Sequence, residues 1–374
     1  MRSSISPHLP DDLVYCDILP LLPAKVLLRF QCVSQSWCQV IRKESYFSYL
    51  QYLHARPHAL LLVDEMHRPT LISRDPISVG FPSLSSQFLD KQVTVIASCN
   101  GIVCIVIRGF DLAYVGNPVL KLWRLLPRPK VHTITLEFSV GLAVFATESS
   151  VSYKLVHPFY ILGTDACGYE EVGFEVFSSE RRTWEVSKEK LLMKRAAVGG
   201  PYAYVDEIMF WAGSDQLLWF DPKEERSGTF PLPSDVSRAG YFLIGEWNSR
   251  LSIALIAGCE IQIWCWNQSS WSKLWSPTLE EITQQIELFS PIRDLIDLPN
   301  LEIGPLDVCF QQRLVRFCSF GVDYFILEVT GILHCYDTRT GKAWKLKCRP
   351  PPQPPFISFT YTNTLVMPPD LLLI

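Results

Sequence analysis

The sequence predicts a small all-α block of three helices at the N-terminus, followed by an all-β propeller of about six blades. Residues 9–41, LPDDLVYCDILPLLPAKVLLRFQCVSQSWCQVI, place apolar side chains at helical spacing between Leu-Pro steps. After residue 110, five segments share one plan, in which a short strand, a polar turn and a second strand with an aromatic residue follow one another. A repeated sheet that cannot cover both of its own faces is typical of stacked blades.

The first predicted helix begins after Pro10, where Asp11 and Asp12 suit the positive end of a helix dipole. Pro23 interrupts that helix and can serve as the first residue of a second one, where the missing N–H of proline is not needed. Ser34 is a suitable N-cap for a third helix. A block of roughly forty residues without a metal site or disulfide framework is too small to be stable alone, so we expect another surface to cover part of it.

A series of residues in this block resembles the F-box motif, position by position, over residues 9 to about 48. The series is Leu9-Pro10, Leu13, Ile18-Leu19, Leu22-Pro23, Leu27, Cys32-Val33-Ser34 and Trp37. In that family the helices dock on a Skp-type adaptor, which connects the protein to a cullin-RING ubiquitin ligase. The resemblance therefore implies these adaptor-binding residues: Leu9, Pro10, Leu13, Ile18, Leu22, Pro23, Leu27, Val33 and Trp37.

Two other interpretations of the helical block stay open at this point. It could be a cap that packs only on its own propeller, or a helix-turn-helix reader of DNA. The third helix, SQSWCQVIRK, lacks a supporting basic face, and the whole chain has a net charge of -4 with 19% charged residues. These values leave no basic field to gather nucleic acid, so we expect no nucleic-acid partner.

The five repeated segments have turns that begin at Asn117, Ser178, Asp221, Asn267 and Asp337, at intervals of 61, 43, 46 and 70 residues. A plausible sixth copy turns at Asp64. An irregular period near 50 fits propeller blades better than a sandwich. Tryptophans recur near each turn, and we expect four of them to lie between neighbouring blades: Trp123, Trp184, Trp271 and Trp344.

The repeats also resemble the F-box-associated, kelch-like propeller region of plant F-box proteins. The strings SCNGIVCI, NPVLKLWRLLP, VFSSERRTWE, FWAGSDQLLWFDP and YDTRTGKAWKL carry this likeness in order. The expected organisation is an N-terminal extension (1–8), an F-box (9–48), a linker (49–56), the propeller (57–349) and a Pro-rich C-terminal segment (350–374). Within the last segment, Leu365-Val366-Met367 is a candidate closing strand.

The sequence points to no catalytic residue, metal or cofactor. A copper oxidase site, which some kelch-like propellers house, would need two histidines and a Tyr-Cys pair at one end, whereas His132, His157 and His334 fall on separate repeats.

The 12 cysteines are scattered without zinc-ligand spacing, as in a reducing compartment. With no signal peptide or membrane-spanning run, we expect a location in the cytoplasm, the nucleus or both, and no membrane partner.

The combined resemblance implies the substrate-recognition subunit of a Skp-cullin-F-box (SCF) ubiquitin ligase, in which the propeller binds an unknown target protein. The alternatives are a propeller that binds ligands outside any ligase, lectin-like or as a scaffold, and an oxidase. We expect target contacts on the least repetitive segments, 163–171 and 277–304, because blade strands are committed to stacking. The candidate residues there are Asp165, Glu170, Glu280, Glu281, Glu287 and Asp294.

Overall fold

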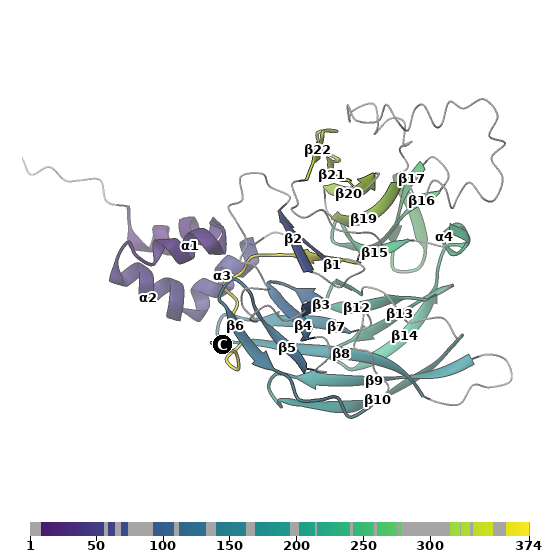
Figure 1. Cartoon of the computed structure of the whole chain (residues 1–374), viewed down its shortest axis with the longest axis horizontal. Helices are drawn as coiled ribbons and strands as arrows, with labels where there is room; N and C mark the ends of the chain where they lie inside the picture. The colour runs from purple at the N-terminus through teal and green to yellow at the C-terminus, as the bar shows by residue number, and fades with distance from the viewer. Residues whose placement is uncertain are drawn as a thin grey trace, which may run out of the picture.

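The structure is a computed structural model of the 374-residue chain (Figure 1). It describes residues 9–55, 59–63, 69–73, 93–107, 112–131, 140–161, 169–194, 202–213, 215–239, 242–257, 260–275, 277, 315–321, 323–329, 332–346 and 357–373. In Figure 1 the N-terminal helices lie beside a larger body built of twisted sheets.

Short helical elements fill residues 13–54. A π-helical segment, η1 (Leu13–Ile18), runs into a 3₁₀ turn, η2 (Leu19–Leu21), and three α-helices follow: α1 (Ala24–Phe30), α2 (Gln35–Lys43) and α3 (Ser45–His54). Pro20 and Pro23 prevent one continuous helix, and α1 begins directly after Pro23. Ser34 caps α2 as predicted, because its hydroxyl accepts a hydrogen bond of 3.1 Å from the backbone N–H of Trp37. The expected linker over 49–56 is wrong, because α3 runs through it as far as His54.

Five antiparallel blades make up most of the described β structure, four of them with four strands and blade 1 with a fifth strand added at its edge. Each of the five predicted hairpins forms the third and fourth strands of one blade. Their strands are β3 (Val93–Cys99), β4 (Ile102–Ile107), β5 (Leu112–Asn117) and β6 (Leu122–Leu125) in blade 1; β7 (Gly141–Ala146), β8 (Val151–Ile161), β9 (Tyr169–Ser178) and β10 (Thr183–Lys194) in blade 2; β11 (Ala203–Val205), β12 (Ile208–Ala212), β13 (Gln216–Asp221) and β14 (Arg226–Pro231) in blade 3; β15 (Leu243–Trp247), β16 (Arg250–Ala257), β17 (Glu260–Trp266) and β18 (Trp271–Trp275) in blade 4; β19 (Val315–Gly321), β20 (Tyr324–Val329), β21 (Ile332–Asp337) and β22 (Ala343–Lys345) in blade 5. Helix α4 (Ser234–Ala239) lies in the connection between blades 3 and 4.

A three-stranded sheet, here called the closing sheet, joins both ends of the propeller region. Its order is β2 (Pro69–Ser73), β1 (Ala59–Val63) and β23 (Ile357–Tyr361). Strand β23 lies between blades 5 and 1, because Ser358 donates to the carbonyl of Cys318 in β19, while Ser98 of β3 donates to the carbonyl of Thr360 at 2.9 Å. The prediction of about six blades is therefore corrected to five, since the sixth copy of the repeat supplies only the β1–β2 hairpin of this closing sheet.

The C-terminal end departs from the sequence prediction. Leu365 and Val366 are buried and Met367 is 46% exposed, and none of the three is in a strand, so this segment is not the closing strand that the sequence suggested. The pairing is made instead by β23 and by β24 (Leu372–Leu373), which adds a fifth strand to blade 1 beside β6. Pro368 and Pro369, which lack N–H donors, help to keep the intervening chain out of the ladder.

Two of the four tryptophans predicted to lie between blades, Trp184 and Trp271, contact the preceding blade. Trp184 of blade 2 is 2% exposed and its indole N–H donates to the carbonyl of Pro127, just after the last strand of blade 1, at 2.9 Å. Trp271 of blade 4 makes the same contact with the carbonyl of Pro231, at the end of blade 3, at 3.0 Å. Trp123 is buried, whereas Trp271 and Trp344 are half-buried.

Candidate functional site: an apolar surface on the N-terminal helices

The N-terminal helices expose more large apolar side chains than their size explains. Seven of the thirteen exposed large hydrophobic side chains among the described residues lie between Leu9 and His54. We use the name N-terminal apolar surface for the five aliphatic ones nearest the start of the chain: Leu9 (55% exposed), Leu13 (42%), Ile18 (39%), Leu21 (61%) and Val33 (58%). Exposed apolar side chains that concentrate on one small element mark it as a candidate protein–protein contact site.

The local fold explains why these side chains face outward. Leu19 and Leu27 are at most 1% exposed and form the buried face of η2 and α1. Residues on the opposite face of these short helices, such as Leu21, are therefore exposed. The rings of Phe30 and Trp37 pack at a centroid distance of 5.7 Å and hold α1 against α2. The turn between these helices then carries the exposed Val33.

Most of the predicted adaptor-binding residues are accessible, with one correction. Leu27 is fully buried, so it supports the helices from inside and presents no surface. Leu22 and Trp37 are half-buried. The sequence did not single out Leu21, although its position between two prolines was a signal that it could not join a continuous helix face. The exposed members of the predicted set are Leu9, Pro10, Leu13, Ile18, Pro23 and Val33.

The helices also touch the propeller, but through a different set of residues. Gln51 of α3 is 2% exposed, and Tyr52 accepts a hydrogen bond of 3.1 Å from the side chain of Asn100 in the first turn of blade 1. Burial raises the pKa of the Tyr52 phenol to about 12, so it stays a neutral partner. The interpretation of the block as a cap on its own propeller thus accounts for α3 and leaves the N-terminal apolar surface uncovered.

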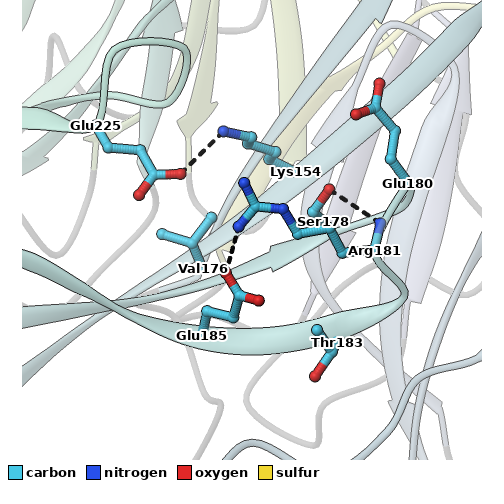
Figure 2. A pocket seen from close by; sticks show the side chains of 8 residues that line it. All are labelled: Lys154, Val176, Ser178, Glu180, Arg181, Thr183, Glu185 and Glu225. Atoms are coloured by element: carbon cyan, nitrogen blue, oxygen red, sulfur yellow. Dashed lines mark hydrogen bonds and ion pairs between the residues drawn. The ribbon is translucent and has the colours of Figure 1, made fainter.

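A polar recess on blade 2 is the second candidate site (Figure 2). It has a volume of about 90 Å³ and lies between the β9–β10 hairpin and the β13–β14 turn of blade 3. Its lining residues are Lys154, Val176, Ser178, Glu180, Arg181, Thr183, Glu185 and Glu225.

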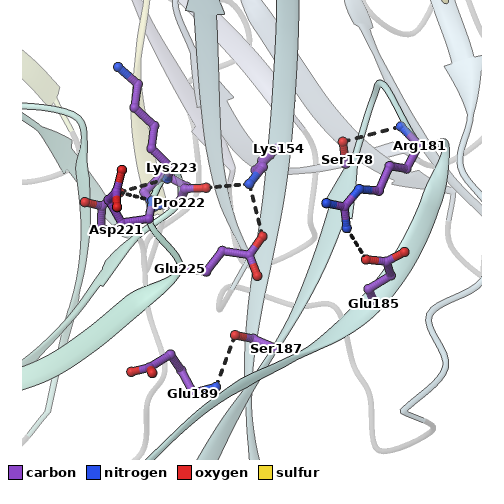
Figure 3. Close-up of polar contacts among 11 residues, drawn as sticks. Lys154, Ser178, Arg181, Glu185, Ser187, Glu189, Asp221, Pro222, Lys223 and Glu225 are labelled. Atoms are coloured by element: carbon purple, nitrogen blue, oxygen red, sulfur yellow. Dashed lines mark hydrogen bonds and ion pairs between the residues drawn. The ribbon is translucent and has the colours of Figure 1, made fainter.

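The two cations of this recess are already paired. The ammonium of Lys154 lies 2.7 Å from the carbonyl of Pro222 and 3.1 Å from a carboxylate oxygen of Glu225, and Arg181 binds Glu185 across the hairpin (Figure 3). Ser178 accepts a hydrogen bond from the backbone N–H of Arg181. With both positive charges neutralised by neighbours, the recess offers little attraction to an anion. The Lys154–Glu225 pair joins blades 2 and 3, whereas the Arg181–Glu185 pair lies within the β9–β10 hairpin of blade 2.

The predicted target-contact residues mostly fall outside the described residues. These are Asp165, Glu280, Glu281, Glu287 and Asp294. Glu170 is described: it is half-buried on β9 and lies opposite Met193 of β10. The structure therefore brings none of these carboxylates together into an observed site.

Most of the two predicted target-contact segments, 163–171 and 277–304, lies outside the described residues. Residues 169–171 of the first segment begin strand β9, and residue 277 is the described part of the second.

Among the described residues of the propeller, the two histidines lie in different blades. Burial lowers the pKa of His157 to about 4 and raises the pKa of the Cys99 and Cys104 thiols to about 12. His334, the other described histidine of the propeller, lies in blade 5, far along the ring from His157 in blade 2. Within the described ranges no three His, Cys, Asp or Glu side chains are placed to hold a metal ion, and no helix is long and apolar enough to cross a membrane.

Sequence comparisons connect this architecture with known proteins. The family described as "F-box protein At3g26010-like, beta-propeller" matches residues 77–222. Among Arabidopsis thaliana proteins, the chain is 24% identical to the putative F-box protein At1g33530 over 72% of this chain and 62% of that protein. It is 25% identical to the F-box protein At3g26010 over 46% of this chain and 42% of that one. The F-box/kelch-repeat protein At3g23880 is 22% identical over 74% of this chain and 81% of its own length.

The chain thus spans less than two thirds of the first two of these relatives. Among solved structures, a chain in a crystal structure of the mitotic checkpoint complex aligns with 66% of this chain and 63% of its own length, at 14% identity and a TM-score of 0.33.

Proposed function

We propose, on the premise that the chain belongs with the plant F-box proteins that carry a β-propeller, that it is the substrate-recognition subunit of an SCF-type ubiquitin ligase. In this proposal the N-terminal helices bind a Skp-type adaptor and the propeller binds the protein to be ubiquitinated. The chain contributes proximity, because it holds target lysines near a conjugating enzyme on the same scaffold.

The observation that carries this proposal is the N-terminal apolar surface. Its five aliphatic residues are exposed on a block whose buried side is already satisfied by the helices themselves and by the propeller. Interfaces between proteins draw most of their binding energy from a few such apolar anchors that become desolvated. A Skp-type adaptor is the partner that F-box relatives predict for them.

The location follows from the same proposal. We place the protein in the cytoplasm, the nucleus or both, and the cysteines support a reducing compartment. The eight described cysteines are all free thiols, three of them on the N-terminal helices. Free exposed thiols persist where glutathione and thioredoxin keep them reduced.

The proposal is tested by titrating a Skp-type adaptor into the purified full chain in a calorimeter. We expect a 1:1 complex that Leu13→Ala combined with Val33→Ala weakens by about 2 kcal/mol, close to thirtyfold in Kd, because both side chains lose apolar contact with the partner. Leu192→Ala is the matched control, since Leu192 is 67% exposed but lies on β10 of the propeller. Equal affinities for the wild type and the double variant would contradict the proposal and favour a propeller that works outside a ligase.

A further inference from the structure

The C-terminal segment of residues 362–371 is buried except at Met367 and Pro369, although it contains no strand. Thr364 and Val366 are fully buried, and Thr362, Asn363 and Leu365 are at most 6% exposed. Backbone N–H and C=O groups that are buried but not paired in a β-sheet need other hydrogen-bond partners. The partners of this segment therefore show what it holds together.

Two side-chain amides bind the segment from opposite sides. Gln51 of α3 donates to the carbonyl of Asn363 at 3.3 Å and accepts from the backbone N–H of Leu365 at 3.0 Å. Asn117, at the end of β5, donates to the carbonyls of Thr364 and Val366, each at 2.9 Å. Successive peptides of one short segment are thus bound alternately to the helical block and to blade 1.

The first turn of blade 1 closes the same set of contacts. The hydroxyl of Thr364 donates to the carbonyl of Asn100 at 2.9 Å, while the side chain of Asn100 donates to Tyr52 of α3 at 3.1 Å. Gly101 follows with a φ of +87°, and a Cβ there would lie 2.1 Å from the hydroxyl of Thr364. The turn can approach the segment this closely only with glycine.

The far end of the segment is tied to blades 1 and 2. Asp370 is 4% exposed and accepts a hydrogen bond of 2.9 Å from the hydroxyl of Tyr153 in β8. The guanidinium of Arg124 in β6 lies 3.5 Å from the same carboxylate and donates to the Asp370 carbonyl at 3.2 Å. The segment is therefore anchored at both ends, and α3 is bound near its beginning.

We propose that residues 362–371 form a C-terminal clasp that fixes the orientation of the N-terminal helices relative to the propeller. The clasp lies between α3 and blade 1 and is hydrogen-bonded to both. We therefore expect the helices to move relative to the propeller when these hydrogen bonds are lost. Resting on the proposed function, this makes the clasp a positioning device: it sets where a target on the propeller lies relative to a ligase bound at the helices.

The clasp is tested on the full chain alone by measuring the distance between spin labels at Gln35 of α2 and Lys188 of β10, both exposed. The labels are introduced as non-natural amino acids, because native thiols are accessible. We expect one narrow distance distribution in the wild type and a broad or displaced one in Gln51→Met, which keeps the side-chain size but removes both hydrogen bonds. Gln39→Met, at an exposed position of α2, is the matched control and should leave the distribution narrow.

Thr364→Val serves as the second variant, because it is nearly isosteric and removes one bond to Asn100 even if Gln51→Met folds poorly. Narrow, unshifted distributions in both clasp variants would overturn the proposal, as would equal broadening in Gln39→Met.

A second readout separates the clasp from the proposed function. In a reconstituted ligase we expect the clasp variants to bind the adaptor as tightly as the wild type and to transfer ubiquitin to a captured target several-fold more slowly. Unchanged transfer by a variant with a broadened distribution would overturn the positioning role. Failure of the wild type to bind any Skp-type adaptor would instead overturn the proposed function, while the distance measurement would still decide whether the clasp exists.

Discussion

At the residue scale, single side chains supply hydrogen bonds to backbone groups in segments that lie outside the β-sheets. Gln51 and Asn117 do so at the clasp, and Asp221 and Asp337 do so in blade turns, where each carboxylate accepts two backbone N–H groups at 2.8 and 3.0 Å. The turn residues were predictable, because Asx turns have local signals. Gln51 was not, because its partners lie more than 300 residues away in the sequence.

Gly101→Ala tests the close approach of the first turn to the clasp. An alanine at this positive φ costs about 1–2 kcal/mol of stability from the strained backbone conformation alone. The added methyl group must also displace Thr364. We expect a lower melting temperature than in Gly341→Ala, which carries a similar φ of 66° in the β21–β22 turn of another blade. Equal effects of the two substitutions would mean that the turn does not press on the clasp.

Trp184→Ala tests the tryptophan contacts between blades. Loss of this buried ring and of its hydrogen bond to Pro127 should lower the free energy of unfolding by about 3–5 kcal/mol. Trp271→Ala should cost less, because Trp271 is half-buried. Denaturant unfolding followed by fluorescence measures both, and a Trp184→Ala protein as stable as the wild type would refute the structural role.

His157 gives the fold a predictable sensitivity to acid. Its pKa is about 4 in the folded chain because burial disfavours the charged ring, against an ordinary value of 6.5, so the unfolded chain takes up the proton first as pH falls. The contribution of the neutral His157 ring to the free energy of unfolding is fully present above pH 6.5. It is lost progressively toward pH 4, by about 2 kcal/mol between pH 6.5 and 5. The melting temperature should therefore drop more between pH 7 and pH 5 in the wild type than in His157→Leu. An equal drop in the two proteins would show that His157 does not cause the sensitivity to acid.

At the element scale, the helices show which local signals the sequence carries. The Ser34 cap and the break at Pro23 were predicted because each depends on neighbouring residues. Helix α3 was missed because its buried side carries the polar Gln51 beside Phe47, so no clean apolar stripe marks it. The accessible part of the candidate site was predicted from a motif resemblance, whereas the burial of Leu27 follows from the packing of η2 and α1, which the motif does not encode.

Ser34→Ala tests the cap of α2. Loss of the bond to the N–H of Trp37 should cost about 1 kcal/mol and speed hydrogen exchange in the first turn of α2. Gln35→Ala is the control, because it leaves the cap in place and favours the helix slightly. A Ser34→Ala protein with unchanged exchange in α2 would show that the cap does not stabilise this helix.

At the scale of the whole molecule, the sequence predicted five outer hairpins and could not predict how the ring closes. The hairpins have local turns and repeat along the chain, so they are visible in the sequence. Closure depends on β23 pairing with β1, almost 300 residues earlier, and on β24 pairing with β6, and neither contact has a local signature. The closure brings the C-terminal clasp to α3, so the same long-range pairing joins the N-terminal helices to the propeller.

The proposed function requires that the N-terminal helices, and not the propeller, bind a Skp-type adaptor. Hydrogen exchange of the full chain with and without the adaptor tests it most directly, because it maps the protected amides along the chain. We expect adaptor-dependent protection to concentrate in residues 13–43 and to leave the strands of blades 1–5 unchanged. Protection confined to the propeller, or no change at a saturating adaptor concentration, would contradict the claim.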